Sequence, residues 1–455
     1  MISLRNLFVS LAVLSGTASY SQSHLPDAST IASKMYPGWN LGNTMEANNG
    51  GQVFTNNIGL AGETQWQSTK TTQEVINYVK EQGFKSVRIP CNWVCGHISN
   101  AADYTIDTNW INRVKEVVDY CINDGLYVLL NDHYDGGWVE TSFTDTSNAT
   151  IENNCAVMKS IWTQIANAFT DYDEHLLFGG LNEPNCDNQD KTDALVRYEQ
   201  AFIDAVRATG GNNATRTLVV QGPSTDIDNT NKYYTSLPTD PADGRLMVEV
   251  HFYSPWQFSG LEEDADWGKM WFFWGAANHV SGGTWSTRNS TSNYEESFVK
   301  SQFQKMKAQF VDKGIPVILG EYGCQWRNVG NSSAQKKHDA SVKLFHKTVN
   351  HYAIENGLIP FVWDINVQNQ NGTKGIMSVI NRGAKSIYCT PAMEGITEGV
   401  NAASKWGGPT SGIVKIPFEQ RAASGNALIY NLSGQRVHSD TKGVVIVAGK
   451  KYVQK

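Results

Sequence analysis

Residues 176–185 read LLFGGLNEPN, an apolar run that ends in an amide, a carboxylate and a proline. Such a uniformly hydrophobic run is typical of a strand in a parallel sheet that is covered on both faces. Pro184 fixes its own φ and disfavours helical geometry at Glu183, which should hold the acid at the end of the strand. Asn182 and Glu183 are neighbours, and on a regular strand they would point to opposite faces, so we expect a local bulge there.

Seven other runs have the same apolar, β-prone character, and stretches with helical periodicity lie between several of them. The runs are 36–44, 86–93, 126–135, 217–224, 246–256, 315–324 and 358–366, and the clearest helical stretches are 71–84, 108–125 and 297–314. Eight repeats of strand then helix predict a (β/α)₈ barrel over residues 30–400. An open doubly wound sheet is the rival, but no GxGxxG follows the first strand.

The composition excludes some classes of function. The chain has 455 residues and a net charge of −7, although its last 45 residues hold seven Lys/Arg and only two Asp/Glu. The remainder is therefore more acidic still, which argues against nucleic acid as a partner. Fourteen Trp, 18 Tyr and 17 Phe make the chain rich in flat side chains, and 40 Gly with only 18% charged residues indicates a loop-rich enzyme.

Both ends of the chain differ from the barrel region. Residues 1–22 combine Arg5, an apolar stretch and then small residues, which predicts a cleaved signal peptide, export and no membrane span in the mature protein. Residues 404–412 (SKWGGPTSG) resemble a linker. We expect 411–455 to form a short β-rich appendage. It resembles short C-terminal segments of exported proteins of gut-type Gram-negative bacteria, which implies sorting or surface retention; a small carbohydrate-binding module, for which Tyr430 and Tyr452 are the only clear aromatic residues, is the rival.

Two acids stand at the ends of predicted strands and carry the chemistry. Glu183 ends the fourth run and Glu321 the seventh, so both should open on the face where the strand ends of such a barrel meet. Two facing carboxylates suit a glycosidic bond: one, kept protonated, donates to the departing oxygen while the other attacks the anomeric carbon or activates water. The alternative is two unrelated rim acids in salt bridges.

Seven motifs, in order, resemble glycoside hydrolase family 5, in the subgroup that contains endo-β-1,4-glucanases. They are GWNLGNTME (38–46), VRIP (87–90), NDHYDGGW (131–138), LNEPN (181–185), HFYSPW (251–256), GEYG (320–323) and VWD (362–364). The resemblance implies a retaining double displacement with Glu183 as acid/base and Glu321 as nucleophile. Their carboxyl groups should then lie about 5–5.5 Å apart.

Further residues at the strand ends are expected to bind substrate. Arg88 should hold Glu321 ionised, with Tyr253 donating to the same carboxylate and His251 pointing the same way. Asn182 can hydrogen-bond the sugar 2-hydroxyl, and Trp363 can form the floor under the cleaved sugar. His133 matches the family's histidine after the third strand; it either binds a sugar hydroxyl or supports Arg88 or Asn182. The family often has His-His there, where this chain has Tyr134.

Several tryptophans are candidate sugar platforms. Trp256 lies beside Tyr253, and Trp39, Trp93 and Trp138 follow the first three strands. In the insert after the sixth strand, Trp267 is a further candidate. Trp271 and Trp274, at helical spacing, either line subsites or form a private core for the loop.

These features together predict an exported, monomeric endo-β-1,4-glucanase acting on cellulose or soluble β-glucans. No cofactor or metal is expected, because both reacting groups are protein carboxylates and the seven cysteines show no metal-ligand spacing; their pairing stays open. The same mechanism on β-mannan or xyloglucan is the first alternative. A noncatalytic glycan-binding protein is the second.

Overall fold

A computed structural model describes residues 25–139, 142–367, 374–403 and 406, and the strand residues 429–431, 443–447 and 450–454. Eight parallel strands close into a barrel in the order β1-β10-β9-β8-β7-β6-β5-β2. They are β1 (Gly38–Asn40), β2 (Ser86–Ile89), β5 (Tyr127–Asn131), β6 (Leu176–Gly179), β7 (Leu218–Gln221), β8 (Leu246–Phe252), β9 (Val317–Tyr322) and β10 (Leu358–Val362). Each lies within one of the eight predicted runs, so the predicted (β/α)₈ barrel is confirmed.

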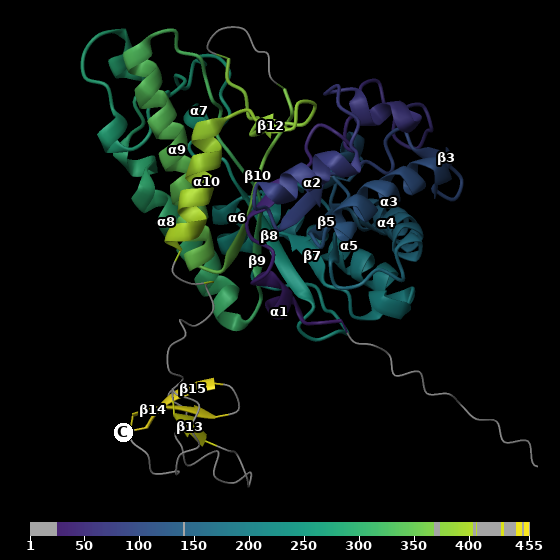
Figure 1. Cartoon of the computed structure of the whole chain (residues 1–455). Coiled ribbons are helices and arrows are strands. Elements are labelled where there is room, and N and C mark those ends of the chain that lie inside the picture. Colours follow the sequence, from purple (N-terminus) through teal and green to yellow (C-terminus); the bar gives the residue numbers. More distant parts are fainter. Residues whose placement is uncertain are drawn as a thin grey trace, which may run out of the picture.

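A helix follows each barrel strand and covers the outside of the sheet (Figure 1). The eight are α2 (Gln73–Glu81), α3 (Thr108–Asn123), α4 (Asn148–Ala168), α5 (Gln189–Ala208), α6 (Ile227–Tyr233), α8 (Glu296–Gln309), α9 (Ser332–Glu355) and α10 (Thr390–Ala402). The predicted helical stretches 71–84, 108–125 and 297–314 correspond to α2, α3 and α8. The loops contain a short helix, α7 (Trp256–Ser259), and two small two-stranded sheets. One sheet pairs β3 (Ile98–Asn100) with β4 (Thr105–Ile106), and the other pairs β11 (Ile380–Asn381) with β12 (Ser386–Ile387).

Local sequence explains where the helices begin and which face they bury. The side chain of Asp107 accepts a hydrogen bond from Asn109 N at the start of α3, and Asn331 caps α9 in the same way. Along α3, Trp110, Val114 and Val117 are buried at helical spacing against the sheet.

The inside of the barrel has two layers because alternate strand residues point inward. The lower layer is apolar, and α1 (Ala28–Ala32) packs against it, at the lower end of the barrel in Figure 1. Its members include Leu129, Leu177, Val219, Met247, Ile318 and Phe361. The layer above is polar and fully buried, with Asn40, Arg88, Asn131, Gln221 and Glu249. The barrel therefore presents buried charge directly below the rim formed by the ends of its strands.

A bulge does occur beside the site, but not where the sequence suggested. Strand β6 ends at Gly179, so Asn182 and Glu183 lie beyond it and need no bulge to point the same way. The register shift falls instead in β9, where Val250 pairs with Leu319 but His251 pairs with Glu321. The residue passed over is Gly320. The extra residue re-aims Glu321 toward the barrel axis.

The predictions about the chain ends remain predictions. The proposed signal peptide, residues 1–22, lies outside the described residues, as does most of 411–455. Within that segment β13 (Ile429–Asn431), β14 (Gly443–Val447) and β15 (Lys450–Gln454) form an antiparallel sheet. In the described part of the chain, no helix is both long and apolar enough to cross a membrane. No disulfide joins the seven cysteines, all of which lie in the described part of the chain.

Candidate active site

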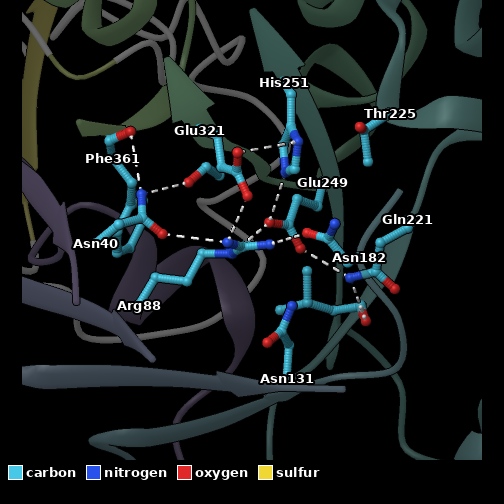
Figure 2. A network of polar contacts seen from close by, with 12 residues as sticks. Asn40, Arg88, Asn131, Asn182, Gln221, Thr225, Glu249, His251, Glu321 and Phe361 are labelled. Carbon is cyan, nitrogen blue, oxygen red and sulfur yellow. Dashed lines mark hydrogen bonds and ion pairs between the residues drawn. The ribbon is translucent and has the colours of Figure 1, made fainter. Parts of the chain in front are cut away.

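Arg88 of β2 lies at the centre of the polar layer and is completely buried (Figure 2). Its Nη1 donates to Glu321 Oε1 at 2.9 Å and to Asn40 Oδ1 at 3.1 Å. Its Nη2 donates to Asn182 Oδ1 at 2.8 Å, and its Nε lies 2.8 Å from Glu249 Oε1. A planar guanidinium with several fixed donors can orient all four groups at once.

Glu321 is held from two sides. Arg88 contacts one carboxylate oxygen, and the Tyr253 hydroxyl donates to the other at 2.8 Å. The side chain of Glu321 is only 8% exposed. The contacts with Arg88 and Tyr253 expected from the sequence are both present, and they fix the position of this carboxylate.

Glu183 contacts His251 and faces solvent. Its Oε1 lies 2.7 Å from His251 Nδ1, and 45% of its side chain is exposed. One oxygen of each carboxylate and one ring nitrogen of His251 all lie within 4.8 Å of one another. Glu183 and Glu321 therefore open on the same mouth, at a separation nearer the roughly 5–5.5 Å of retaining glycosidases than the roughly 6.5–9.5 Å of inverting ones.

Buried charges change the proton affinity of these groups. Burial favours neutral His251, but the three carboxylates around it outweigh burial and raise its pKa to about 10. Burial also raises the pKa of Glu321, while His251 and Arg88 oppose that rise. Arg88 does lower the pKa of Glu321, as expected, but burial has the larger effect, so the pKa of this carboxyl lies above its usual value. For Glu183, burial is outweighed by the hydrogen bond to His251, which holds its pKa below the usual value.

The other predicted sugar contacts surround this pair. Asn182 is buried, and because its Oδ1 accepts from Arg88, its Nδ2 is the group oriented to donate. The ring of His133 lies parallel to that of Trp363, with centroids 6.0 Å apart. Burial and the nearby positive Arg88 hold the pKa of His133 well below its usual value, so this imidazole is neutral. A neutral ring and an indole are suitable partners for an uncharged sugar.

A cavity of about 290 Å³ opens beside Glu183. Its wall includes His251, Tyr253, Asp228 and Trp256. The side chain of Trp256 is half exposed and its ring stands edge-on to Tyr253, with centroids 6.2 Å apart. Trp256 therefore lies where a chain leaving Glu183 would pass, and it remains a candidate platform.

The other tryptophan platforms predicted after the first three strands are wrong. Trp39 is fully buried, because Gly38 and Asn40 point into the barrel and Trp39 must point away; its Nε1 donates to Asp364 Oδ2 at 2.9 Å. Trp93 and Trp138 are likewise buried and donate to backbone or carboxylate oxygens of the β5 segment.

The insert after β8 divides its tryptophans between surface and core. Trp267 is exposed, whereas Trp274 is buried and packs against Phe258 and Phe345. Residues 271–274 are not helical, so the helical spacing of Trp271 and Trp274 has no structural meaning. Trp274 therefore belongs to the main hydrophobic core and neither lines a subsite nor forms a separate core for the loop.

Three buried polar residues of the site were missed by the sequence analysis: Asn40, Gln221 and Glu249. Asn40 orients Arg88 and also donates to Gly320 O at 2.9 Å. Gln221 donates to Glu249 Oε2 at 2.8 Å. For Glu249, the sequence did contain a signal: it lies two residues before His251, and this spacing places both side chains on the same face of β8.

Glu183, His251 and Glu321 are close enough together to be considered as cation ligands. The guanidinium of Arg88, 2.9 Å from Glu321, and the positive charge on His251 both oppose a second cation at this point. The donor set therefore fits proton transfer between hydrogen-bonded groups better than it fits a metal ion.

Comparisons with known proteins agree with this geometry. The sequence profile of the family described as "Cellulase (glycosyl hydrolase family 5)" matches residues 47–369. Endoglucanase A of Paenibacillus barcinonensis is 34% identical over 391 residues, which cover 80% of this chain and 90% of that protein.

Solved structures add two relatives. A GH5 xyloglucan-specific β-1,4-glucanase from a ruminal metagenomic library, in complex with XXLG, has a TM-score of 0.76 and 46% identity, over 85% of this chain and 99% of that one. A GH5-4 broad specificity endoglucanase from Ruminococcus champanellensis, with bound cellotriose, has a TM-score of 0.66 and 31% identity, over 82% and 98%.

The barrel and its paired rim carboxylates define a glycoside hydrolase acting on O-glycosyl bonds. The chain belongs to glycosyl hydrolase family 5.

The corrected placement of Trp39 can be tested against that of Trp256. Trp39→Ala should lower the free energy of unfolding by about 3–5 kcal/mol, because it removes a buried indole and leaves Asp364 without one donor. Trp256→Ala, at a half-exposed position, should change it by less than about 1 kcal/mol. Chemical denaturation of both variants measures this, and equal losses would contradict the placement.

Proposed function

We propose that this chain is an exported endo-β-1,4-glucanase that hydrolyses β-glucans with retention of configuration. The observation that carries the mechanism is the pair of carboxylates, Glu183 and Glu321, within 4.8 Å of one another at one mouth of the barrel. Inverting enzymes need a gap of about 6.5–9.5 Å to admit a water molecule. Export is supported by the leader-like residues 1–22, and N-terminal sequencing that finds Met1 on the mature protein would contradict it.

The different surroundings of the two carboxylates support different roles. Glu321 is the nucleophile: it is buried and fixed by Arg88 and Tyr253, which aim one oxygen at the anomeric carbon. Glu183 is the acid/base: its exposed side chain can reach the leaving oxygen and exchange protons with water. In the first step a Glu321 oxygen bonds to the anomeric carbon, the glycosidic bond breaks, and the departing oxygen takes a proton from Glu183.

His251 supplies that proton. Glu183 has a lowered pKa in the free site, and the proton it delivers is held at the 2.7 Å contact with His251 Nδ1. As charge builds on the leaving oxygen, the proton moves across this contact through the Glu183 carboxyl group. In the second step Glu183 removes a proton from water, which attacks the glycosyl ester and releases Glu321, and that proton returns to His251 Nδ1 across the same contact.

Xyloglucan is the substrate we favour among the β-1,4-glucans. The 46% identical structure is described as xyloglucan-specific, and its match covers 85% of this chain. The cavity beside Glu183 offers both an aromatic side chain, Trp256, and carboxylates such as Asp228. A branched glucan presents more hydroxyl groups for hydrogen bonding than a linear one. A cavity wall with both aromatic and carboxylate side chains is therefore suited to it.

Variants of the two carboxylates should separate their roles. Glu321→Ala should lower kcat more than about 10⁴-fold on every glycoside, because no covalent intermediate can form. Glu183→Ala should lower kcat about 10²- to 10⁴-fold on glucans but far less on aryl glycosides, whose good leaving groups need little protonation. Steady-state kinetics on both substrate types measures this. A Glu321→Ala variant with the turnover of the parent would favour a glycan-binding protein instead.

A substrate panel tests the proposed specificity. Purified protein should release reducing ends from xyloglucan fastest, with slower release from carboxymethylcellulose and lichenan, and little from β-mannan. The Glu321→Ala protein, prepared identically, controls for contaminating hydrolases. A preference for mannan would reverse the assignment, and inactivity on every β-glucan would remove it.

A further inference from the structure

A third carboxylate lies beneath the two catalytic ones. Glu249 of β8 is completely buried, and it is not among the residues that line the cavity beside Glu183. Its Oε1 lies 2.8 Å from Arg88 Nε and 3.3 Å from His251 Nε2 (Figure 2). Burial favours neutral Glu249, but Arg88 and then His251 outweigh burial and lower its pKa. Glu249 is therefore an anion between two cations.

Each of those cations directly contacts a catalytic carboxylate, and His251 Nδ1 also lies 3.8 Å from Glu321 Oε2. Arg88 Nη1 contacts Glu321 at 2.9 Å, and His251 Nδ1 contacts Glu183 at 2.7 Å. The five groups alternate in charge from Glu321 through Arg88, Glu249 and His251 to Glu183. Because a buried charge is costly unless it is paired, each member limits where its neighbours can lie.

Neighbouring strands hold Glu249 in place. Gln221 of β7 donates from Nε2 to Glu249 Oε2 at 2.8 Å, and its Oε1 accepts from Leu181 N at 2.8 Å, just before Asn182. On the other side, a Cβ at Gly320 would lie 1.8 Å from Glu249 Oε1. The bulged residue of β9 must therefore be a glycine for the carboxylate to fit. Glu249 thus connects the segment that carries Glu183 with the strand that carries Glu321.

We propose that Glu249 is a positioning residue for hydrolysis, which fixes Arg88 and His251 so that the two catalytic carboxylates keep their separation and their shared proton. This proposal rests on the function proposed above. When Glu321 becomes an ester it loses its charge, and Glu249 is the anion that remains in contact with both cations. Glu249 therefore still balances the positive charges of Arg88 and His251, and holds both side chains in place, while the covalent intermediate exists.

Removing the charge of Glu249 should change the pH dependence as well as the rate. The charged and titratable groups around it are Arg88 of β2, His133 after β5, Glu183 after β6, His251 and Tyr253 of the β8 segment, and Glu321 of β9. Loss of a nearby negative charge weakens proton binding by His251 and Glu183, whose proton the leaving oxygen needs. The alkaline limb of the rate profile should therefore move to lower pH.

The test is Glu249→Gln in the full chain, which keeps the size of the side chain and removes its charge. We expect kcat on a soluble β-glucan to fall about 10- to 100-fold with KM within about two-fold, because the reacting groups are displaced while the sugar contacts remain. The alkaline limb should shift down by about one pH unit. Glu249→Asp restores the charge and should return the limb to its original position.

A matched control is Glu63→Gln. Glu63 is a buried carboxylate paired with Arg113 at 2.7 Å, outside the active site. The Glu63→Gln variant should lose stability as Glu249→Gln does, but the pH dependence of its hydrolysis rate should not change. If Glu249→Gln does not fold, Glu249→Asp decides: a several-fold lower kcat at unchanged KM supports the proposal, and wild-type kcat overturns it.

The outcomes separate this proposal from the proposed function. A wild-type protein that hydrolyses β-glucans, with a Glu249→Gln variant of equal kcat and an unmoved alkaline limb, would overturn the positioning role alone. A wild-type protein that hydrolyses no glucan would overturn both.

Discussion

The buried guanidinium of Arg88 is the contact on which the site depends. A charge removed from water is tolerated only where partners replace the lost hydration, and Arg88 has two carboxylates and two amide oxygens within 3.1 Å. Those partners come from β1, β8, β9 and the segment after β6. One side chain therefore fixes the relative positions of groups that the chain separates by more than 200 residues.

Closure of the barrel makes this arrangement possible. Alternate residues of each strand point inward, and the lower layer, with Met247 and Ile318 among its members, consists of hydrophobic side chains. One step up the same strands, Glu249 follows Met247 on the inner face, and the β9 bulge at Gly320 brings Glu321 inward. The rim that carries Glu183 and Glu321 thus lies above a charged layer, and that layer lies above an apolar one.

Much of this was predictable from the sequence, because long apolar runs specify strands and polar residues at their ends specify a rim. Glu183, Glu321 and Arg88 were found in this way, and the structure brings them together. The prediction that Trp39 is a sugar platform failed because a position near a strand end does not say which face of the strand a residue occupies. That face follows only once its neighbours Gly38 and Asn40 are known to point into the barrel. Glu249 was missed because it lies inside an apolar run rather than at its end, and the bulge was misplaced because Gly320 was not considered as a break in β9.

The central claim is that Glu183 and Glu321 are too close for water to enter between them, so that the bond must break through a covalent intermediate. Proton NMR of the first product formed from a soluble β-glucan tests this most directly, because it resolves the anomeric configuration before mutarotation. The account predicts that the β-anomer appears first. Initial appearance of the α-anomer would contradict it.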